Sequence, residues 1–201
     1  MATLRYIVHE LAFDFINHSE TAAEVVDHSY AENINDYHAP FQGANPWVVS
    51  ECFKQLRGIG VNPVQSSFLD YGSGKGRVMI MALRAGFKSV VGVEYDARLC
   101  EIANKNIAKI KGKDPIGNWV VQNGDAADYE VPDDVSVAFL YNPFGCNLVA
   151  QVMRKLQASV ATTPRKLYVV YVNPVCADAL IELGFVQISD VVGEARIFTI
   201  R

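Results

Sequence analysis

A strand-like segment that ends in an acid and runs directly into alternating glycines is the feature that most constrains the fold of this 201-residue chain. Residues 67–76 read SFLDYGSGKG, and a stretch with the apolar spacing of a helix follows. Glycine lets the backbone turn tightly and brings its N–H groups against a ligand, because no Cβ stands in the way. The segment predicts a buried strand, a ligand-binding loop and a helix, which meet in this order at the carboxyl edge of a parallel sheet.

Short β-branched segments alternate with longer amphipathic segments from residue 66 onward. Strands are expected at 67–71, 89–94, 119–121, 135–141, 166–172, 185–191 and 195–200, and helices at 76–85, 96–112, 148–160 and 177–183. This alternation predicts a parallel sheet with helices on both faces. A tight turn around Gly193 separates the last two strands, so they should form an antiparallel hairpin. The predicted fold class is α/β: a doubly wound, Rossmann-like sheet of about seven strands, mostly parallel with an antiparallel C-terminal hairpin, plus an N-terminal helical cap.

The first 65 residues have a different pattern from the rest of the chain. Residues 33–46 are rich in turn formers, and residues 47–56 have the spacing of a helix. We expect residues 1–65 to form an N-terminal cap or lid and residues 66–201 to form a ligand-binding core, together in one compact domain. The 50% of apolar and 20% of charged residues exclude a largely disordered chain.

Charge and hydropathy limit the partners of the protein. The net charge is −4 and the basic residues are scattered, so nothing in the composition supports binding to a large nucleic acid. No stretch approaches the roughly 18–20 uninterrupted apolar residues of a membrane span. His9, Glu10 and Asp14 interrupt what would be the apolar core of a signal peptide. We therefore expect a cytoplasmic protein with no membrane partner.

The cysteines and histidines do not form a recognisable metal or redox motif. The four cysteines are Cys52, Cys100, Cys146 and Cys176, and none belongs to a C-x-x-C or C-x-H pair. The four histidines all precede residue 39, at spacings that do not align them on one helix face. We therefore expect no metal ion, and the spacing of the cysteines indicates no redox motif.

Three kinds of cofactor loop are compatible with a strand that runs into glycines. The dinucleotide fingerprint G-x-G-x-x-G requires glycine or alanine at position 77, where this chain has Arg77. A P-loop requires serine or threonine after its Gly-Lys pair, and Gly76 stands there instead. The remaining form, an acid followed by G-x-G-x-G, resembles motif I of the class I S-adenosylmethionine-dependent methyltransferases.

Two further acids fall where this family places them: Glu94 ends the second expected strand, and Asp125 follows the third. The resemblance covers residues 66–201 and implies a Rossmann-like methyltransferase that binds S-adenosyl-L-methionine. It implies that Glu94 accepts hydrogen bonds from the ribose hydroxyls, and that Asp125 and the backbone N–H of its neighbour bind the adenine. The implied cofactor-binding residues are Asp70, Gly72, Ser73, Gly74, Gly76, Glu94, Tyr95, Asp125, Ala126 and Asn142.

The fourth expected strand ends in Asn142-Pro143-Phe144. This segment resembles the Asn-Pro-Pro-Tyr/Phe motif of methyltransferases that act on conjugated amino groups, with one proline fewer. In those enzymes the amide oxygen and the first proline carbonyl accept the N–H bonds of the target, which turns the nitrogen lone pair toward the methyl group. Taken with the glycine loop and residues 92–94, it also resembles the non-SET histone-lysine methyltransferases and their small prokaryotic relatives.

The resemblance therefore implies methyl transfer to a nitrogen acceptor, a protein lysine or another amine, with Asn142, Pro143 and Phe144 as the catalytic residues. Tyr37 and Gln42 are candidates to fold over the cofactor and the acceptor. A planar amino group of a small molecule or nucleotide is the alternative acceptor. From another class, an NAD(P)-dependent oxidoreductase or a non-catalytic nucleoside-binding module remains open.

Overall fold

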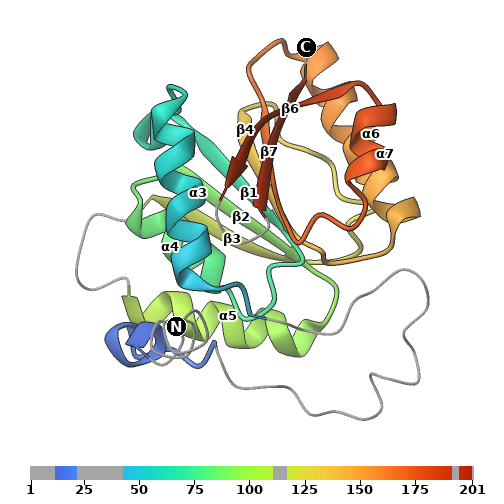
Figure 1. Ribbon diagram of the computed structural model, residues 1–201. Coiled ribbons are helices and arrows are strands. Elements are labelled where there is room, and N and C mark those ends of the chain that lie inside the picture. Colours follow the sequence, from blue (N-terminus) through green and yellow to red (C-terminus); the bar gives the residue numbers. More distant parts are fainter. Residues whose placement is uncertain (1–11, 22–42, 111–116, 192–194, 201) are drawn as a thin grey trace.

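The computed structural model describes residues 12–21, 43–110, 117–191 and 195–200. In this part of the chain seven strands form one sheet, in the order β3-β2-β1-β4-β5-β7-β6 (Figure 1). The strands are β1 (Ser67–Tyr71), β2 (Ser89–Glu94), β3 (Asn118–Asn123), β4 (Val135–Tyr141), β5 (Tyr168–Val172), β6 (Phe185–Val191) and β7 (Ala195–Ile200). The five strands β1 to β5 are parallel, and β7 is antiparallel to both β5 and β6. The predicted fold class and the C-terminal hairpin are confirmed.

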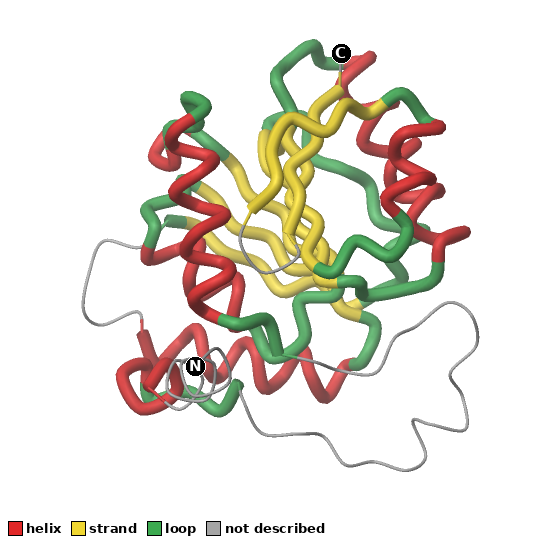
Figure 2. The backbone as a smooth tube through the Cα atoms, viewed as in Figure 1, coloured by secondary structure: helices red, strands yellow, loops and turns green. Residues whose placement is uncertain are grey.

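Helices cover both faces of the sheet (Figures 1 and 2). They are α3 (Pro46–Gly58), α4 (Arg77–Arg84), α5 (Ala97–Ile110), α6 (Cys146–Thr162) and α7 (Ala177–Glu182), with a 3₁₀ turn at η1 (Pro63–Gln65) and a short helical segment at residues 12–17. Helices α3, α4 and α5 share one apolar cluster with the sheet, and α6 and α7 share a second cluster on the opposite face. All residues of β1 are buried because a central parallel strand is covered from both sides.

Phe68 shows how the apolar residues of β1 form the core. Its ring centroid lies 5.0 Å from that of Phe87, 5.7 Å from that of Phe53 and 6.1 Å from that of Phe139. These aromatic rings come from α3, from the segment after α4 and from β4, so one side chain ties three parts of the chain to the central strand.

The strand order reverses beside β1, which pairs with β2 on one side and β4 on the other. In doubly wound sheets ligands bind at the carboxyl ends of the strands where the strand order reverses, which here are the ends of β1, β2 and β4. The glycine-rich segment follows β1, Glu94 ends β2 and Asn142 follows β4.

The N-terminal region contributes to the core before the first strand begins. Asn45 caps the N-terminus of helix α3: its side-chain oxygen accepts hydrogen bonds from the backbone N–H groups of Trp47 and Val48. Its buried face packs in the same cluster as α4. None of the helices in the described part of the chain combines the length and the apolar character that a membrane-spanning helix requires.

Candidate cofactor and acceptor site

Three glycines after β1 adopt left-handed backbone conformations. The φ angles are +72° at Gly72, +53° at Gly74 and +82° at Gly76, which caps the N-terminus of α4. A Cβ on Gly72 would lie 2.5 Å from the Cβ of Pro143. The loop therefore requires glycine both for its backbone and for its close approach to the segment after β4.

Glu94 holds this loop against the end of β2. Its Oε2 accepts a hydrogen bond from the Gly74 N–H at 2.9 Å, and its Oε1 accepts one from the Asp96 N–H at 2.9 Å. The side chain is buried, and burial raises the pKa of Glu94, while the two backbone hydrogen bonds act in the opposite direction. Each carboxylate oxygen keeps a second lone pair, so the group can also accept hydrogen bonds from a pair of hydroxyls.

Buried polar atoms without a partner gather around the same loop. Among the described residues these are Asp70 Oδ2 and Ser73 Oγ. Burial raises the pKa of Asp70 to about 8, and the nearby charge of Glu94 adds to the increase. A buried polar group without a hydrogen bond costs about 1–3 kcal/mol, so a polar ligand that met these atoms would recover part of that cost.

Gly92 explains why the second strand approaches the loop so closely. A Cβ at this position would lie 2.3 Å from Met79 Sδ and 2.7 Å from Ser73 Oγ. A side chain here would push the loop away from β2. The residues thus fit a cofactor that contains adenosine. The glycine loop exposes its backbone N–H groups, the buried carboxylate of Glu94 lies beside it, and Asp70 and Ser73 have buried oxygens without partners.

The segment after β3 is tied to the end of β2. The Asn123 side-chain Nδ2 donates to the carbonyl oxygens of Glu94 at 3.0 Å and Tyr95 at 2.8 Å. Asp125 Oδ1 accepts a hydrogen bond from the Ala127 N–H at 2.8 Å, which closes an Asx turn. Ala126 is buried, whereas Tyr95 is 58% exposed. The predicted adenine-binding residues thus lie next to the predicted ribose-binding carboxylate, and their roles remain predictions.

The segment after β4 lies on the other side of the glycine loop. Asn142 has a φ of +40°, and its Oδ1 accepts a hydrogen bond from the Tyr171 hydroxyl at a long distance of 3.4 Å. Pro143 packs against Gly72. Phe144 is buried in the cluster beneath α6, so its ring belongs to the core in this conformation. The structure thus brings Asn142 and Pro143 to the loop and directs Phe144 into the interior.

The structure contains a disulfide that the cysteine spacing did not indicate. Cys146, the first residue of α6, forms a disulfide with Cys176, and their Cα atoms are 5.3 Å apart. Both cysteines follow Asn-Pro turns at the ends of β4 and β5, which are neighbouring parallel strands. This placement is the signal that could have predicted the bridge, because neighbouring strand ends bring residues together that are 30 positions apart.

Arg77 is a functional candidate that the sequence analysis considered only as a departure from the dinucleotide motif. It is buried at the start of α4, where its Nε donates to Thr21 Oγ1 at 2.8 Å and its Nη1 to the Ala44 carbonyl oxygen at 2.9 Å. The predicted lid residues Tyr37 and Gln42 lie outside the described residues.

Comparisons with known proteins agree with this geometry. The family model described as "Methyltransferase domain" matches residues 68–163. No curated protein matches the sequence.

Many solved structures share the fold. One is a protein of Pyrococcus horikoshii, described as a candidate RNA methyltransferase, which is 19% identical with a TM-score of 0.56 over 84% of this chain and 90% of that one. The magnesium protoporphyrin IX methyltransferase of Synechocystis PCC 6803 with bound S-adenosylmethionine is 14% identical, with a TM-score of 0.54 over 76% and 77%. The ribosomal protein L11 methylase of Lactobacillus delbrueckii subsp. bulgaricus is 20% identical, with a TM-score of 0.54 over 78% and 79%.

These structures establish the fold, and the match over residues 68–163 identifies a methyltransferase domain within the chain. The matched residues include the glycine loop, Glu94, Asp125 and Asn142, which converge at the carboxyl edge of the sheet. Residues 68–163 therefore form a methyltransferase domain with a Rossmann-like fold, and its cofactor is S-adenosylmethionine.

Proposed function

We propose that the protein transfers the methyl group to a nitrogen acceptor, a protein lysine or another amine. The observation that carries the proposal is the position of Asn142 and Pro143: they end β4 directly beside the glycine loop, with the Pro143 Cβ 2.5 Å from where a Gly72 Cβ would be. Nothing larger than a hydrogen separates the cofactor loop from this segment. An acceptor held by Asn142 would therefore lie next to the reactive end of the cofactor.

The residues of this chain need to do little beyond positioning. The cofactor supplies a methyl group already activated by its bond to a positively charged sulfur. The Asn142 amide oxygen and the Pro143 carbonyl would accept the acceptor's N–H bonds and so turn the nitrogen lone pair toward the methyl carbon. Fixing this geometry replaces an encounter in solution with a preoriented pair. The left-handed backbone of Asn142 (φ +40°) is a sparsely populated conformation of the kind found at functional sites.

The cofactor residues have distinct proposed roles. The glycine loop would bind the methionine end, together with Asp70 and Ser73, whose buried oxygens lack partners among the described residues. Glu94 would accept the ribose hydroxyls, with Tyr95 beside it, and the segment at Asp125 and Ala126 would bind the adenine. Residues 1–65 would form the cap on this core.

A planar amino group of a small molecule or nucleotide is the second candidate acceptor. The resemblance of Asn142-Pro143-Phe144 to the motif of enzymes that act on conjugated amino groups favours it. A lysine acceptor must also lose a proton before it can attack, which a conjugated amine at neutral pH need not do. Structural relatives act, by their names, on RNA, a porphyrin and a ribosomal protein, so the fold is compatible with either class.

Binding is tested first, by calorimetric titration with S-adenosylmethionine, S-adenosylhomocysteine and NAD in parallel. We expect micromolar binding of the two sulfur nucleosides and its loss in Glu94→Ala. Binding of NAD alone would overturn the proposal in favour of an oxidoreductase. The titration separates the role of Glu94 from any question about the acceptor.

Methyl transfer is then measured with labelled S-adenosylmethionine and a panel of lysine peptides, small amines and nucleotides. Asn142→Ala should lose transfer and keep most of its S-adenosylhomocysteine affinity. Asn173→Ala is the matched control, because Asn173 occupies the equivalent Asn-Pro turn after β5 with a φ of +48°. Unchanged transfer in Asn142→Ala, or an equal loss in both variants, would refute the proposed role of Asn142.

A further inference from the structure

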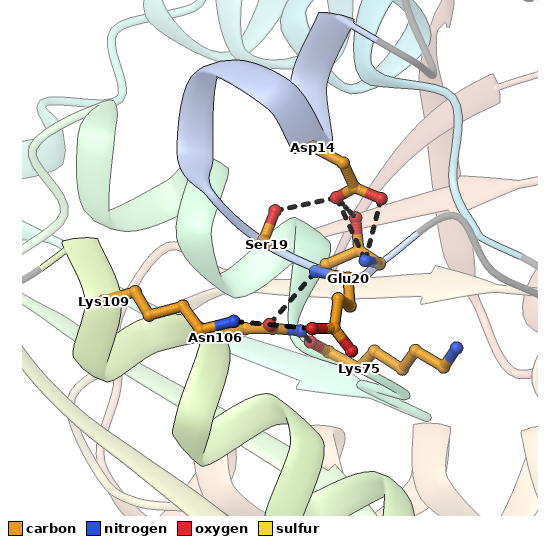
Figure 3. Close-up of polar contacts among 7 residues, drawn as sticks. Asp14, Ser19, Glu20, Lys75, Asn106 and Lys109 are labelled. Carbon is orange, nitrogen blue, oxygen red and sulfur yellow. Dashed lines mark hydrogen bonds and ion pairs between the residues drawn. The ribbon is translucent and has the colours of Figure 1, made fainter.

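The N-terminal segment 12–21 docks beside the glycine loop through a buried polar network (Figure 3). Asp14 is its centre: the carboxylate accepts hydrogen bonds from Ser19 Oγ at 2.7 Å, from the Thr21 N–H at 2.9 Å and from Thr21 Oγ1 at 2.6 Å. Thr21 is fully buried. Because three donors converge on one carboxylate, the position of the Thr21 hydroxyl is closely defined.

Thr21 connects this network to the residue that follows the glycine loop. Arg77 Nε donates to Thr21 Oγ1 at 2.8 Å, and the same hydroxyl donates to Asp14. A guanidinium can only donate and a carboxylate can only accept, so the group between them must do both, as a hydroxyl does. Arg77 comes directly after Gly76, and its position therefore affects the end of the loop.

Space for the Arg77 guanidinium comes from a second part of the N-terminal region. A Cβ on Gly43 would lie 3.0 Å from Arg77 Nη1, and the neighbouring Ala44 carbonyl accepts a hydrogen bond from this nitrogen at 2.9 Å. The ring of Phe13 lies 5.6 Å from the guanidinium carbon. Three segments of the chain thus enclose one side chain at the start of α4.

Asn106 makes the second connection. It lies on α5 with 1% of its surface exposed, and its Nδ2 donates to the Lys75 carbonyl oxygen at 3.1 Å. Its Oδ1 accepts a hydrogen bond from the Glu20 N–H at 3.1 Å. One side-chain amide thereby joins the backbone of the glycine loop to the backbone of the N-terminal segment.

The charges around Lys75 support this docking. Burial lowers the pKa of Lys75, and the carboxylates of Asp14 and Glu20 act in the opposite direction. Glu20 also lies 3.8 Å from the Lys109 ammonium at the surface. The N-terminal segment thus brings negative charge to a loop that carries Lys75 and Arg77.

We propose that segment 12–21 positions the cofactor loop, with Thr21 acting through Arg77 and Asn106 acting through the Lys75 carbonyl. A loop with three left-handed glycines has many alternative conformations. If the docked segment already excludes some of them in the free protein, the loop loses less conformational entropy when the cofactor binds. Thr21, Arg77 and Asn106 are positioning residues, since they hold the loop and do not contact the reacting atoms. Because coupling between sites is reciprocal, cofactor binding should in turn stabilise the docked segment.

Matched variants test the network. Thr21→Val replaces the hydroxyl by a methyl group of nearly the same size, and Thr21→Ser keeps the hydroxyl. We expect Thr21→Val to bind S-adenosylhomocysteine about tenfold more weakly, the effect of losing a hydrogen bond to a charged group, and Thr21→Ser to stay within about threefold of the wild type. Asn106→Ala should weaken binding in the same way. Asn104→Ala is its control, because Asn104 lies on the exposed side of α5 and bonds within its own helix.

Hydrogen exchange of the wild-type protein tests the inference without any variant, so it is informative even if the variants do not fold. S-adenosylhomocysteine should slow exchange of the amides in residues 12–21 as well as in the loop. The inference is overturned if Thr21→Val and Asn106→Ala fold like the wild type and bind S-adenosylhomocysteine with wild-type affinity. It is also overturned if the ligand does not change hydrogen exchange in residues 12–21. Failure of the wild type to bind the ligand would refute the cofactor assignment instead, and no result here depends on the nature of the acceptor.

Discussion

Removal of the disulfide between Cys146 and Cys176 is the perturbation whose effect on stability can be worked out most directly. The bridge closes a loop with a sequence separation of 30 residues. In the chain-entropy model, a crosslink over a loop of this length destabilises the unfolded chain, relative to the uncrosslinked one, by about 3.6 kcal/mol. For a protein of this size that corresponds to a decrease of roughly 7–14 °C in the melting temperature on reduction.

Thermal unfolding with and without a dithiol reductant measures this shift. The double variant Cys146→Ser/Cys176→Ser is the control, because it should melt at one temperature in both buffers. Thiol titration of the unfolded protein should find two reactive groups before reduction and four after it. The two are Cys52 and Cys100, which are buried as free thiols, and burial raises the pKa of each, to about 12 and about 11.

Two results would refute the reasoning. One is an unreduced wild-type protein with four titratable thiols, which would mean that the bridge does not form. The other is a bridged protein whose melting temperature does not respond to reductant. In that case residual structure would restrict the unfolded, reduced chain between Cys146 and Cys176 as much as the disulfide does.

Three other perturbations have outcomes that follow from single residues. Gly72→Ala places a Cβ in a left-handed conformation 2.5 Å from the Pro143 Cβ, so it should cost at least about 1–2 kcal/mol in urea unfolding and weaken S-adenosylhomocysteine binding; wild-type values for both would contradict the close approach. The pKa of Asp70 is raised to about 8, so the folded state binds more protons than the unfolded state between about pH 4 and pH 8, and stability should fall as the pH rises through this range. Asp70→Asn should flatten that dependence, and an equally steep decline in the variant would rule out Asp70 as its source. Arg165→Ala removes hydrogen bonds of 2.6 Å to the Val135 carbonyl and of 3.0 Å to the Ser159 carbonyl near the end of α6, and should cost about 2 kcal/mol in urea unfolding, whereas the exposed Arg154→Ala should change little.

Most of the fold could be predicted because the signals are local. Strands β1, β2, β4, β6 and β7 begin and end at the predicted residues. Asp96 accepts a hydrogen bond from the Arg98 N–H at 2.8 Å, as a predicted helix cap should. The glycine loop after β1 and Glu94 at the end of β2 could be located because they are local features, and their resemblance to a known family implied the cofactor.

The position of β7 between β5 and β6 could not be predicted, although the hairpin itself was. A hairpin of given sequence can add to a sheet by either of its strands. The choice depends on packing against distant segments such as α3, which lies far earlier in the chain and contacts both strands of the hairpin.

The site, like the fold, combines features that depend on nearby residues with contacts that depend on distant ones. The sequence alone determined the strand-loop-helix units, the cofactor loop and the acids that follow neighbouring strands, because these depend on residues a few positions apart. The tertiary structure decided that Cys146 meets Cys176, that Phe144 turns into the core and that Thr21 reaches Arg77. Those contacts join residues from 30 to 56 positions apart, or depend on what packs against a side chain. Such partners leave no periodicity or spacing in the sequence, since they are selected only when the sheet and its helices bring distant segments together.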